Sequence, residues 1–305
     1  MAFIWGVPYF LIRVAVKQLE PPVVVFGRTV LAAAILGVVA HRRGAIRPAL
    51  RRWRPVLAFA VVEMAVPWIL LTTAEQHLTS GLTALIIASV PVIGAILAFG
   101  FGDRAALRLG RVVGISVGLG GVALLVARDL GSAEAPPWGS VVAVLAVCVC
   151  YASAPFIVDR KLTGVPSLGV IAVSLGVVSA FYAPIAVASL PAEAPGATAL
   201  LAVLGLASVC TGLAFVVFFM LLDEVGPARA GLITFANPVV AVALGALFLG
   251  ERVTLATVVG FLLVLAGCWL ATRPASVARR TGDGSTGPDV TREGGRARLP
   301  RRSAA

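Results

Sequence analysis

Residues 80–101, SGLTALIIASVPVIGAILAFGF, form an apolar stretch without a single charged side chain. At about 1.5 Å per residue, a helix of roughly 20 such residues crosses the hydrocarbon core of a bilayer. A membrane-spanning β-strand would need only about 10 residues and would alternate between apolar and polar side chains, which this stretch does not. The stretch therefore predicts a membrane-spanning α-helix.

The same apolar character extends over most of the chain. Residues of the AVILMFWYC set make up 59% of the 305 residues, and charged residues only 13%. A water-soluble domain could not bury so much apolar surface, whereas lipid can contact it directly. We predict an all-α integral membrane protein with ten transmembrane helices. The predicted spans are residues 2–18, 22–40, 55–74, 80–101, 109–127, 139–158, 168–190, 198–222, 228–249 and 254–272.

Several classes of function do not fit this composition. The net charge of +11 comes mostly from short arginine clusters between apolar segments, so membrane topology explains it better than a nucleic-acid partner does. There is no phosphate-binding glycine loop and no zinc motif, and we expect no metal, no cofactor and no enzymatic activity. The cysteines lie inside apolar segments without metal-ligand spacing, as small core residues do: Cys148, Cys150, Cys210 and Cys268.

Basic residues are distributed unevenly between the two sets of loops. About twenty lie in loops 41–54 and 102–111, after the sixth and eighth spans, and in the segment after residue 272, against three in the alternate loops. The positive-inside rule then places both termini in the cytoplasm of a cell with the protein in its inner or plasma membrane. It also makes 128–138 an external connecting loop. Residues 273–305 are basic and poor in apolar residues, which predicts a disordered cytoplasmic tail.

The chain contains an internal repeat. Residues 84–91, ALIIASVP, resemble residues 231–238, GLITFANP. About a dozen residues later, each copy is followed by a Gly-acid-Arg turn, at 102–104 and at 250–252. We expect these turns to cap helix ends and to fix the geometry between helices.

The repeat divides the ten spans into two halves of five, residues 1–127 and 139–272. Because five is odd, the second half enters the membrane from the opposite side. Inverted repeats are the architecture of many secondary transporters, whose solute site lies near the midplane between the halves.

These features resemble the EamA family of the drug/metabolite transporter superfamily. The resemblance covers about residues 3–272 and implies ten helices in two inverted five-helix repeats. It also implies export, or sometimes uptake, of metabolites such as amino acids. One departure is Asp103, where relatives more usually have Glu. The matching features are Trp5-Gly6, Pro21-Pro22, Arg28 with Ala32, Pro91, Pro238 and the two Gly-acid-Arg turns.

Glu63 lies near the middle of the third predicted span. A carboxylate at that depth costs about 2.5–3.5 kcal/mol on insertion scales, so it should face a polar cavity or a partner. One interpretation is a proton-carrying or substrate-amine-binding group. The alternative is a structural acid paired with Arg28 or Arg13.

Arg28 and Arg13 have a similar ambiguity. Arg28 can hold a substrate carboxylate through a bidentate contact, or serve as the charge partner that pins a neighbouring helix. The same two roles are possible for Arg13. Because Arg13 lies near a helix end, however, its side chain is expected to extend to the membrane–water interface.

Aromatic and polar residues supply candidates for a cavity lining. They offer apolar contact, and the aromatic rings also attract amines through cation–π interactions. Packing or lipid contact is the alternative for each aromatic residue. The candidates are Trp5, Tyr9, Trp68, Tyr151, Phe235 and Asn237. Pro91 and Pro238 are candidate helix breaks at corresponding positions of the halves, where transporters place binding sites; an architectural kink is the alternative.

Together these observations favour a proton-coupled secondary transporter that exports small amino-acid-like or amphipathic solutes. Its partners would be a small solute, the lipid bilayer and protons, and the fold would also allow a homodimer. An intramembrane lipid- or isoprenoid-modifying enzyme, or a channel or scramblase, are the alternatives; the enzyme would require clustered acids, His or Ser that the sequence lacks.

Overall fold

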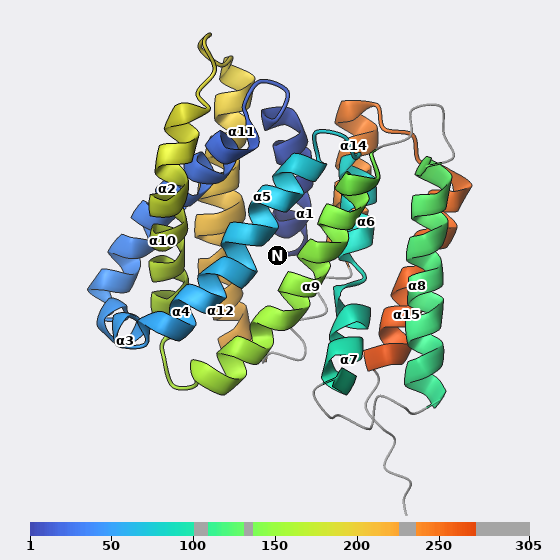
Figure 1. Cartoon of the computed structure of the whole chain (residues 1–305), viewed down its shortest axis with the longest axis horizontal. Helices are drawn as coiled ribbons and strands as arrows, with labels where there is room; N and C mark the ends of the chain where they lie inside the picture. The colour runs from blue at the N-terminus through green and yellow to red at the C-terminus, as the bar shows by residue number, and fades with distance from the viewer. Residues whose placement is uncertain (101–108, 131–136, 226–235, 273–305) are drawn as a thin grey trace, which may run out of the picture. The chain divides into compact units, whose positions relative to one another are not determined.

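The computed structural model describes residues 1–100, 109–130, 137–225 and 236–272. The predicted tail 273–305 and the Gly-Asp-Arg turn at 102–104 lie outside these ranges. Helices make up nearly all of the described part (Figure 1). In chain order they are α1 (Ala2–Ala15), α2 (Pro21–Arg42), α3 (Ile46–Arg51), α4 (Trp53–Phe59), η1 (Ala60–Ala65), α5 (Val66–Ala74), α6 (Ser80–Ile87), α7 (Val90–Gly100), α8 (Leu109–Leu130), α9 (Trp138–Lys161), α10 (Ser167–Ala188), α11 (Ala197–Ala207), η3 (Ser208–Leu213), α12 (Ala214–Val225), α14 (Asn237–Leu249) and α15 (Leu255–Thr272).

These helices form an all-helical membrane protein. In the described residues, seven continuous or broken helices are long and apolar enough to cross a bilayer, and three shorter apolar helices accompany them. The third span is α4–η1–α5, the fourth α6–α7, the eighth α11–η3–α12 and the ninth includes α14. The prediction of a membrane-spanning helical fold is confirmed, with one addition. Helix α3 lies in the arginine-rich connection 41–54, which the sequence predicted as a loop.

Helix contacts follow the inverted-repeat pattern. The second and seventh spans pack together (α2 with α10), as do the fourth and ninth (α6 with α14) and the fifth and tenth (α8 with α15). The first span packs on the eighth and ninth, and the sixth packs on the third and fourth in the same way. Exchanging the two halves therefore leaves the contact pattern unchanged, as expected of two five-helix repeats of opposite orientation.

The third span of each half contains a π-helical turn. Turn η1 covers Ala60–Ala65 and turn η3 covers Ser208–Leu213, at corresponding positions of the two halves. In η3 the Thr211 hydroxyl donates to the Leu206 carbonyl five residues earlier, at 2.8 Å. Such turns are rare and occur often at functional sites. The sequence analysis did not predict them.

The fourth span is broken within the predicted stretch 80–101. Helix α6 ends at Ile87, and α7 begins at Val90 with Pro91 in its first turn, where the missing N–H of proline costs least. The Ser89 hydroxyl donates to the Ile86 carbonyl, at 2.7 Å, and satisfies one of the freed backbone groups. In the other half, α14 begins at Asn237 with Pro238 in its first turn.

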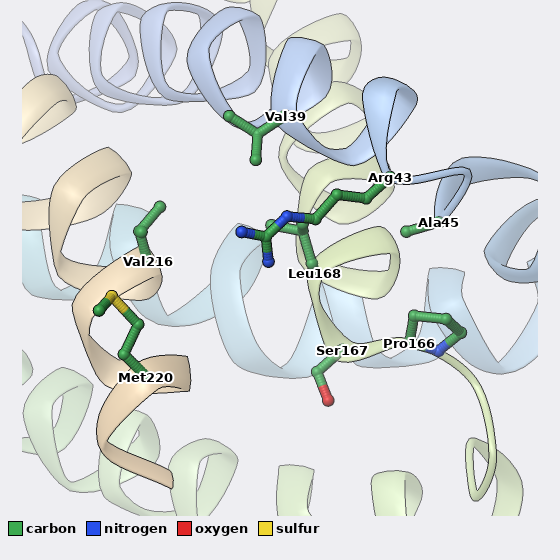
Figure 2. A pocket seen from close by; sticks show the side chains of 8 residues that line it. All are labelled: Val39, Arg43, Ala45, Pro166, Ser167, Leu168, Val216 and Met220. Carbon is green, nitrogen blue, oxygen red and sulfur yellow. The ribbon is translucent and has the colours of Figure 1, made fainter. Parts of the chain in front are cut away.

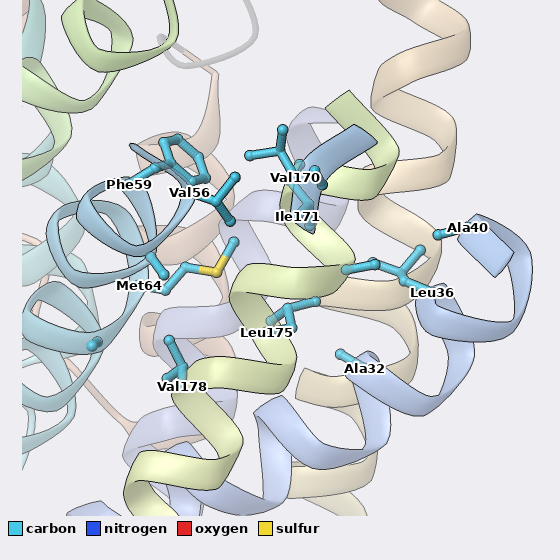
Figure 3. Close-up of a cluster of buried hydrophobic side chains, with 14 of the residues drawn as sticks. Ala32, Leu36, Ala40, Val56, Phe59, Met64, Val170, Ile171, Leu175 and Val178 are labelled. Atoms are coloured by element: carbon cyan, nitrogen blue, oxygen red, sulfur yellow. The ribbon is translucent and has the colours of Figure 1, made fainter. Parts of the chain in front are cut away.

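The largest buried cluster joins α2, the third span and α10. Leu36 from α2, Met64 from η1 and Leu175 from α10 are all fully buried, and Figure 3 shows the side chains around them. Small residues, including Ala32 and Ala40 on α2, let the helices approach closely. This cluster fixes α2 against α10 and the third span, and α2 carries Arg28.

Glycines bring α8 and α15 into close contact. A Cβ atom added at Gly121 would lie 2.8 Å from both the Gly260 carbonyl oxygen and the Val264 nitrogen, so no side chain fits there. Gly114 meets backbone atoms of α15 in the same way, and Gly118 lies against Gly267 of α15 and Val92 of α7. Small residues thus let these helices pack closely together.

We expect Gly121→Ala to lower the melting temperature of the purified protein, because the methyl group would collide with backbone atoms of α15 that cannot move separately. Gly120→Ala is the matched control on the same helix, since its added Cβ would have no neighbour within 4 Å. It should leave the melting temperature unchanged or raise it, because alanine favours a helix over glycine by about 0.5–1 kcal/mol. Equal melting temperatures for the two variants would contradict the packing.

Candidate functional site

Arg28 occupies a buried position on α2, where the two halves meet. Its side chain is 9% exposed. Its Nε donates to the Thr211 hydroxyl in the other half, at 2.8 Å, and its guanidinium carbon lies 3.8 Å from the centre of the Trp68 ring. A cation–π contact of a desolvated arginine contributes about 2 kcal/mol. Thr211 and Trp68 thus hold the guanidinium group in a fixed orientation.

The other two nitrogens of this guanidinium group have no hydrogen-bond partner among the described residues. In the described part of the chain, Nη1 and Nη2 of Arg28 make no hydrogen bond, although neither atom is fully enclosed. The Thr211 hydroxyl cannot take on another donor role, because its proton already bonds to the Leu206 carbonyl. Two parallel N–H groups on a fixed planar fork match the geometry of a carboxylate.

Three of the predicted aromatic residues gather around Arg28. Trp68 and Tyr9 are buried and Tyr151 is half-buried. The charge of Arg28 acts on the hydroxyls of both tyrosines, and the two tyrosines also interact with each other. The sequence could list these side chains as candidates, and the structure brings them together from α1, α5 and α9.

The remaining candidates lie elsewhere. Trp5 packs against Phe218 and Phe215 of α12, at centroid distances of 4.7 and 6.3 Å. Asn237 is half-buried and Pro238 buried, at the start of α14. A Cβ added to Gly6 of α1 would lie 2.7 Å from the Asn237 carbonyl oxygen, so α1 packs directly on that start. Phe235 lies outside the described residues.

Glu63 lies on turn η1, on the same side of the span as the buried residues Phe59 and Pro67. Its side chain is half-buried, and its charge acts on Tyr151 and Cys150 of α9. It forms no ion pair with a described residue. Arg28 and Arg13, the partners that the structural alternative gave it, bond instead to the Thr211 hydroxyl and to the Glu75 carbonyl.

Arg13 and Glu75 form the contact that the sequence missed. Nη1 of Arg13 donates to the main-chain carbonyl of Glu75. Glu75 follows the third span directly, and its side chain is 0% exposed, so it is more deeply enclosed than Glu63. Glu75 is not among the site residues that the sequence predicts.

The turn at 250–252 connects the two halves. Gly250 ends α14 with φ of 67°, a conformation that glycine adopts readily. The Glu251 carboxylate then accepts from the N–H of Ser80, at 2.8 Å, and from the N–H of Gly81, at 3.0 Å. These are the first N–H groups of α6, where a carboxylate is favourable. The expectation that this turn caps a helix end is confirmed.

A separate pocket lies at the arginine-rich end of the bundle. It has a volume of about 440 Å³ and is lined where α2 ends, α10 begins and α12 passes, with Arg43 pointing across it (Figure 2). None of the predicted site residues lines it. Among the described residues, no group of three or more His, Cys, Asp or Glu side chains is placed to hold a metal ion.

We expect Thr211→Val to destabilise the protein, because it removes the acceptor of the buried Arg28 Nε. A hydrogen bond to a charged group contributes about 1.5–3 kcal/mol. The melting temperature in detergent should fall accordingly. The control is Ser208→Ala on the same turn, since Ser208 is only partly buried and its hydroxyl bonds to the Leu204 carbonyl of its own helix. Equal melting temperatures for Thr211→Val and Ser208→Ala would show that the hydrogen bond from Arg28 to Thr211 does not stabilise the protein.

Comparison with protein families gives a match over most of the chain. The model of the EamA-like transporter family matches residues 1–127 and 138–273. The uncharacterized inner membrane transporter YedA of Escherichia coli K12 is 31% identical over 256 residues, which cover 82% of this chain and 81% of YedA. The uncharacterized transporter YvbV of Bacillus subtilis is 24% identical over 274 residues, which cover 87% of each protein.

The fold also has a counterpart among solved structures. One crystal structure superposes with a TM-score of 0.65 and covers 92% of this chain and 95% of its own. The sequences are 23% identical, so this likeness concerns the fold alone.

Proposed function

This chain belongs to the EamA-like transporter family, and we propose that it exports small amino-acid-like or amphipathic solutes by proton-coupled alternating access. Its family makes it a multi-pass inner-membrane transporter and not an enzyme. The observation that carries the proposal is the guanidinium group of Arg28. It is fixed by both halves of the protein, and two of its nitrogens are free of described partners.

The position of Arg28 suits alternating access. Arg28 and Trp68 belong to the first half and Thr211 to the second. A rocking movement of one half against the other changes the contact with Thr211, and with it the orientation of the fork. The binding of a carboxylate to Nη1 and Nη2 would then depend on which end of the bundle is open.

Aromatic side chains around the fork complete the solute site. Tyr9 and Tyr151 offer hydroxyl groups and apolar ring surface close to Arg28. Solutes that combine a carboxylate with an apolar or amine-bearing part match this lining best. The site therefore favours amino-acid-like solutes over neutral sugars or inorganic ions.

Glu63 provides the second charge of the proposed mechanism. Its carboxyl lies half-buried at mid-span, has no ion-pair partner among the described residues, and is close enough to Tyr151 for the two groups to interact. In this setting it either takes up the driving proton or binds a solute amine. We assign it the proton.

A channel or scramblase is the competing function for the same helical frame. Solute counterflow in proteoliposomes separates the two, because only a carrier accelerates uptake when solute is present on the opposite side. The hydrogen bond between Arg28 and Thr211 favours the carrier. Because it joins the two halves, a movement of one half against the other would change the proposed binding site.

We expect Glu63→Gln to abolish solute flux driven by an imposed pH gradient while leaving expression and counterflow intact. Flux is measured in proteoliposomes with a panel of amino acids and amphipathic amines, with and without the gradient. Glu193→Gln, in an exposed loop, is the control and should behave as the wild type. A Glu63→Gln variant with full gradient coupling would refute the proton role of Glu63.

We expect both termini to be cytoplasmic. A membrane-impermeant thiol reagent should label Glu193→Cys in intact cells, because its loop would be external. Arg47→Cys, in the arginine-rich connection, should be labelled only after the membrane is permeabilised. Labelling of both positions from the same side would overturn this topology and the inverted arrangement with it.

A further inference from the structure

Glu75 is a buried acid without a hydrogen-bond partner. Its side chain is 0% exposed, and within the described part of the chain neither carboxyl oxygen has a donor. The nearest guanidinium group, that of Arg13, bonds to the main-chain carbonyl of Glu75 instead of to its carboxyl. A carboxylate in such a place lacks both water and the hydrogen bonds that would replace it.

Charged and titratable groups from three segments surround this carboxyl. They are Arg13 and Tyr9 on α1, Arg28 on α2, and Glu251 in the turn after α14. Burial raises the pKa of the Glu75 carboxyl well above its usual range, and Glu251 acts in the same direction. The two arginines oppose this effect without cancelling it. Glu251 itself is engaged as an acceptor at the start of α6.

The end of the bundle around Glu75 is closed. Gln18 accepts at Oε1 from the N–H of Gly196, at 2.7 Å, and so links the loop after α1 to the start of α11. Glu251 links the turn after α14 to α6. The side chains of Leu19 and Leu78 at this end are buried. Glu75 itself is 0% exposed, so water does not reach its carboxyl in this structure.

We propose that Glu75 is an occlusion-linked proton site, which holds a proton while this end of the bundle is closed and releases it when the end opens. Opening admits water, the O–H bond of the carboxylic acid breaks, and the proton passes to water. The carboxylate that remains is then hydrated and lies beside Arg13 and Arg28. Closing reverses each step. This site rests on alternating access as proposed above, but it is distinct from Glu63, which is half-buried at mid-span.

Infrared spectroscopy of the purified protein in lipid nanodiscs tests the protonation state without any solute. At neutral pH the wild type should show a C=O band of a protonated carboxylic acid that is lost in Glu75→Gln and retained in Glu193→Gln. Because Glu63 can contribute a band of its own, the comparison is repeated in a Glu63→Gln background. If Glu75→Gln removes no band in either background, the proposal is wrong. Glutamine has the shape of the neutral acid, so the variant should fold as the wild type does.

A reversible cross-link tests the connection to closure. Gly196 and Gln18 are each replaced with Cys, and a short bis-methanethiosulfonate reagent joins them; a Cβ at Gly196 would lie 3.1 Å from the Gln18 side chain. The Glu75 band should titrate at a pH at least one unit higher in the cross-linked protein than after reduction of the linker. That shift is a tenfold change in proton affinity. Equal titration midpoints would show that the proton is not linked to closure.

The two proposals can fail separately. If the protein carries no solute under a pH gradient but the Glu75 band behaves as described, the proton site stands and the proposed function fails. If gradient-driven flux is found and Glu75→Gln leaves the spectrum unchanged, the function stands and the proton site fails.

Discussion

The absence of water from the bilayer core is the constraint on which this structure depends. Every buried polar group must then find its partner within the protein. Hydroxyl side chains meet this need locally, as where Thr72 donates to the Trp68 carbonyl at 2.6 Å. Arg28 meets it through Thr211 and the ring of Trp68, two groups that come from different halves. The buried charge of Arg28 therefore joins the two halves, because its partners come from both of them.

The same constraint explains the closed end. The Glu251 carboxylate could not be left bare between helices, and the first N–H groups of α6 could not be left without acceptors. Their mutual hydrogen bonds solve both problems at once. Gly245 makes room for this contact, since a Cβ there would collide with the Glu251 carboxylate. The short turn after α14 thus fixes the distance between the ninth span and the fourth.

Hydropathy and internal repetition were sufficient to predict the membrane class, the spans and the inverted halves. They could not predict turns η1 and η3, because the residues AVVEMA and SVCTGL suit a regular α-helix equally well. The extra residue in each turn is stabilised by contacts across the bundle, such as that of Thr211 with Arg28. Glu75 was missed for a similar reason. It follows the last apolar residue of its span, and the groups around it come from distant segments, α1, α2 and the turn after α14.

Glu63 lies within the third span and Glu75 directly after it, and the two carry the same chemical group, yet their surroundings differ. The side chain of Glu63 is half-buried, whereas that of Glu75 is fully buried. At the end of the bundle where Glu75 lies, contacts connect separate spans, through Gln18 with Gly196 and Glu251 with Ser80. A packed interface of this kind has two discrete states and few intermediate ones. In the proposed cycle the hydration of Glu75 therefore follows the state of this end of the bundle.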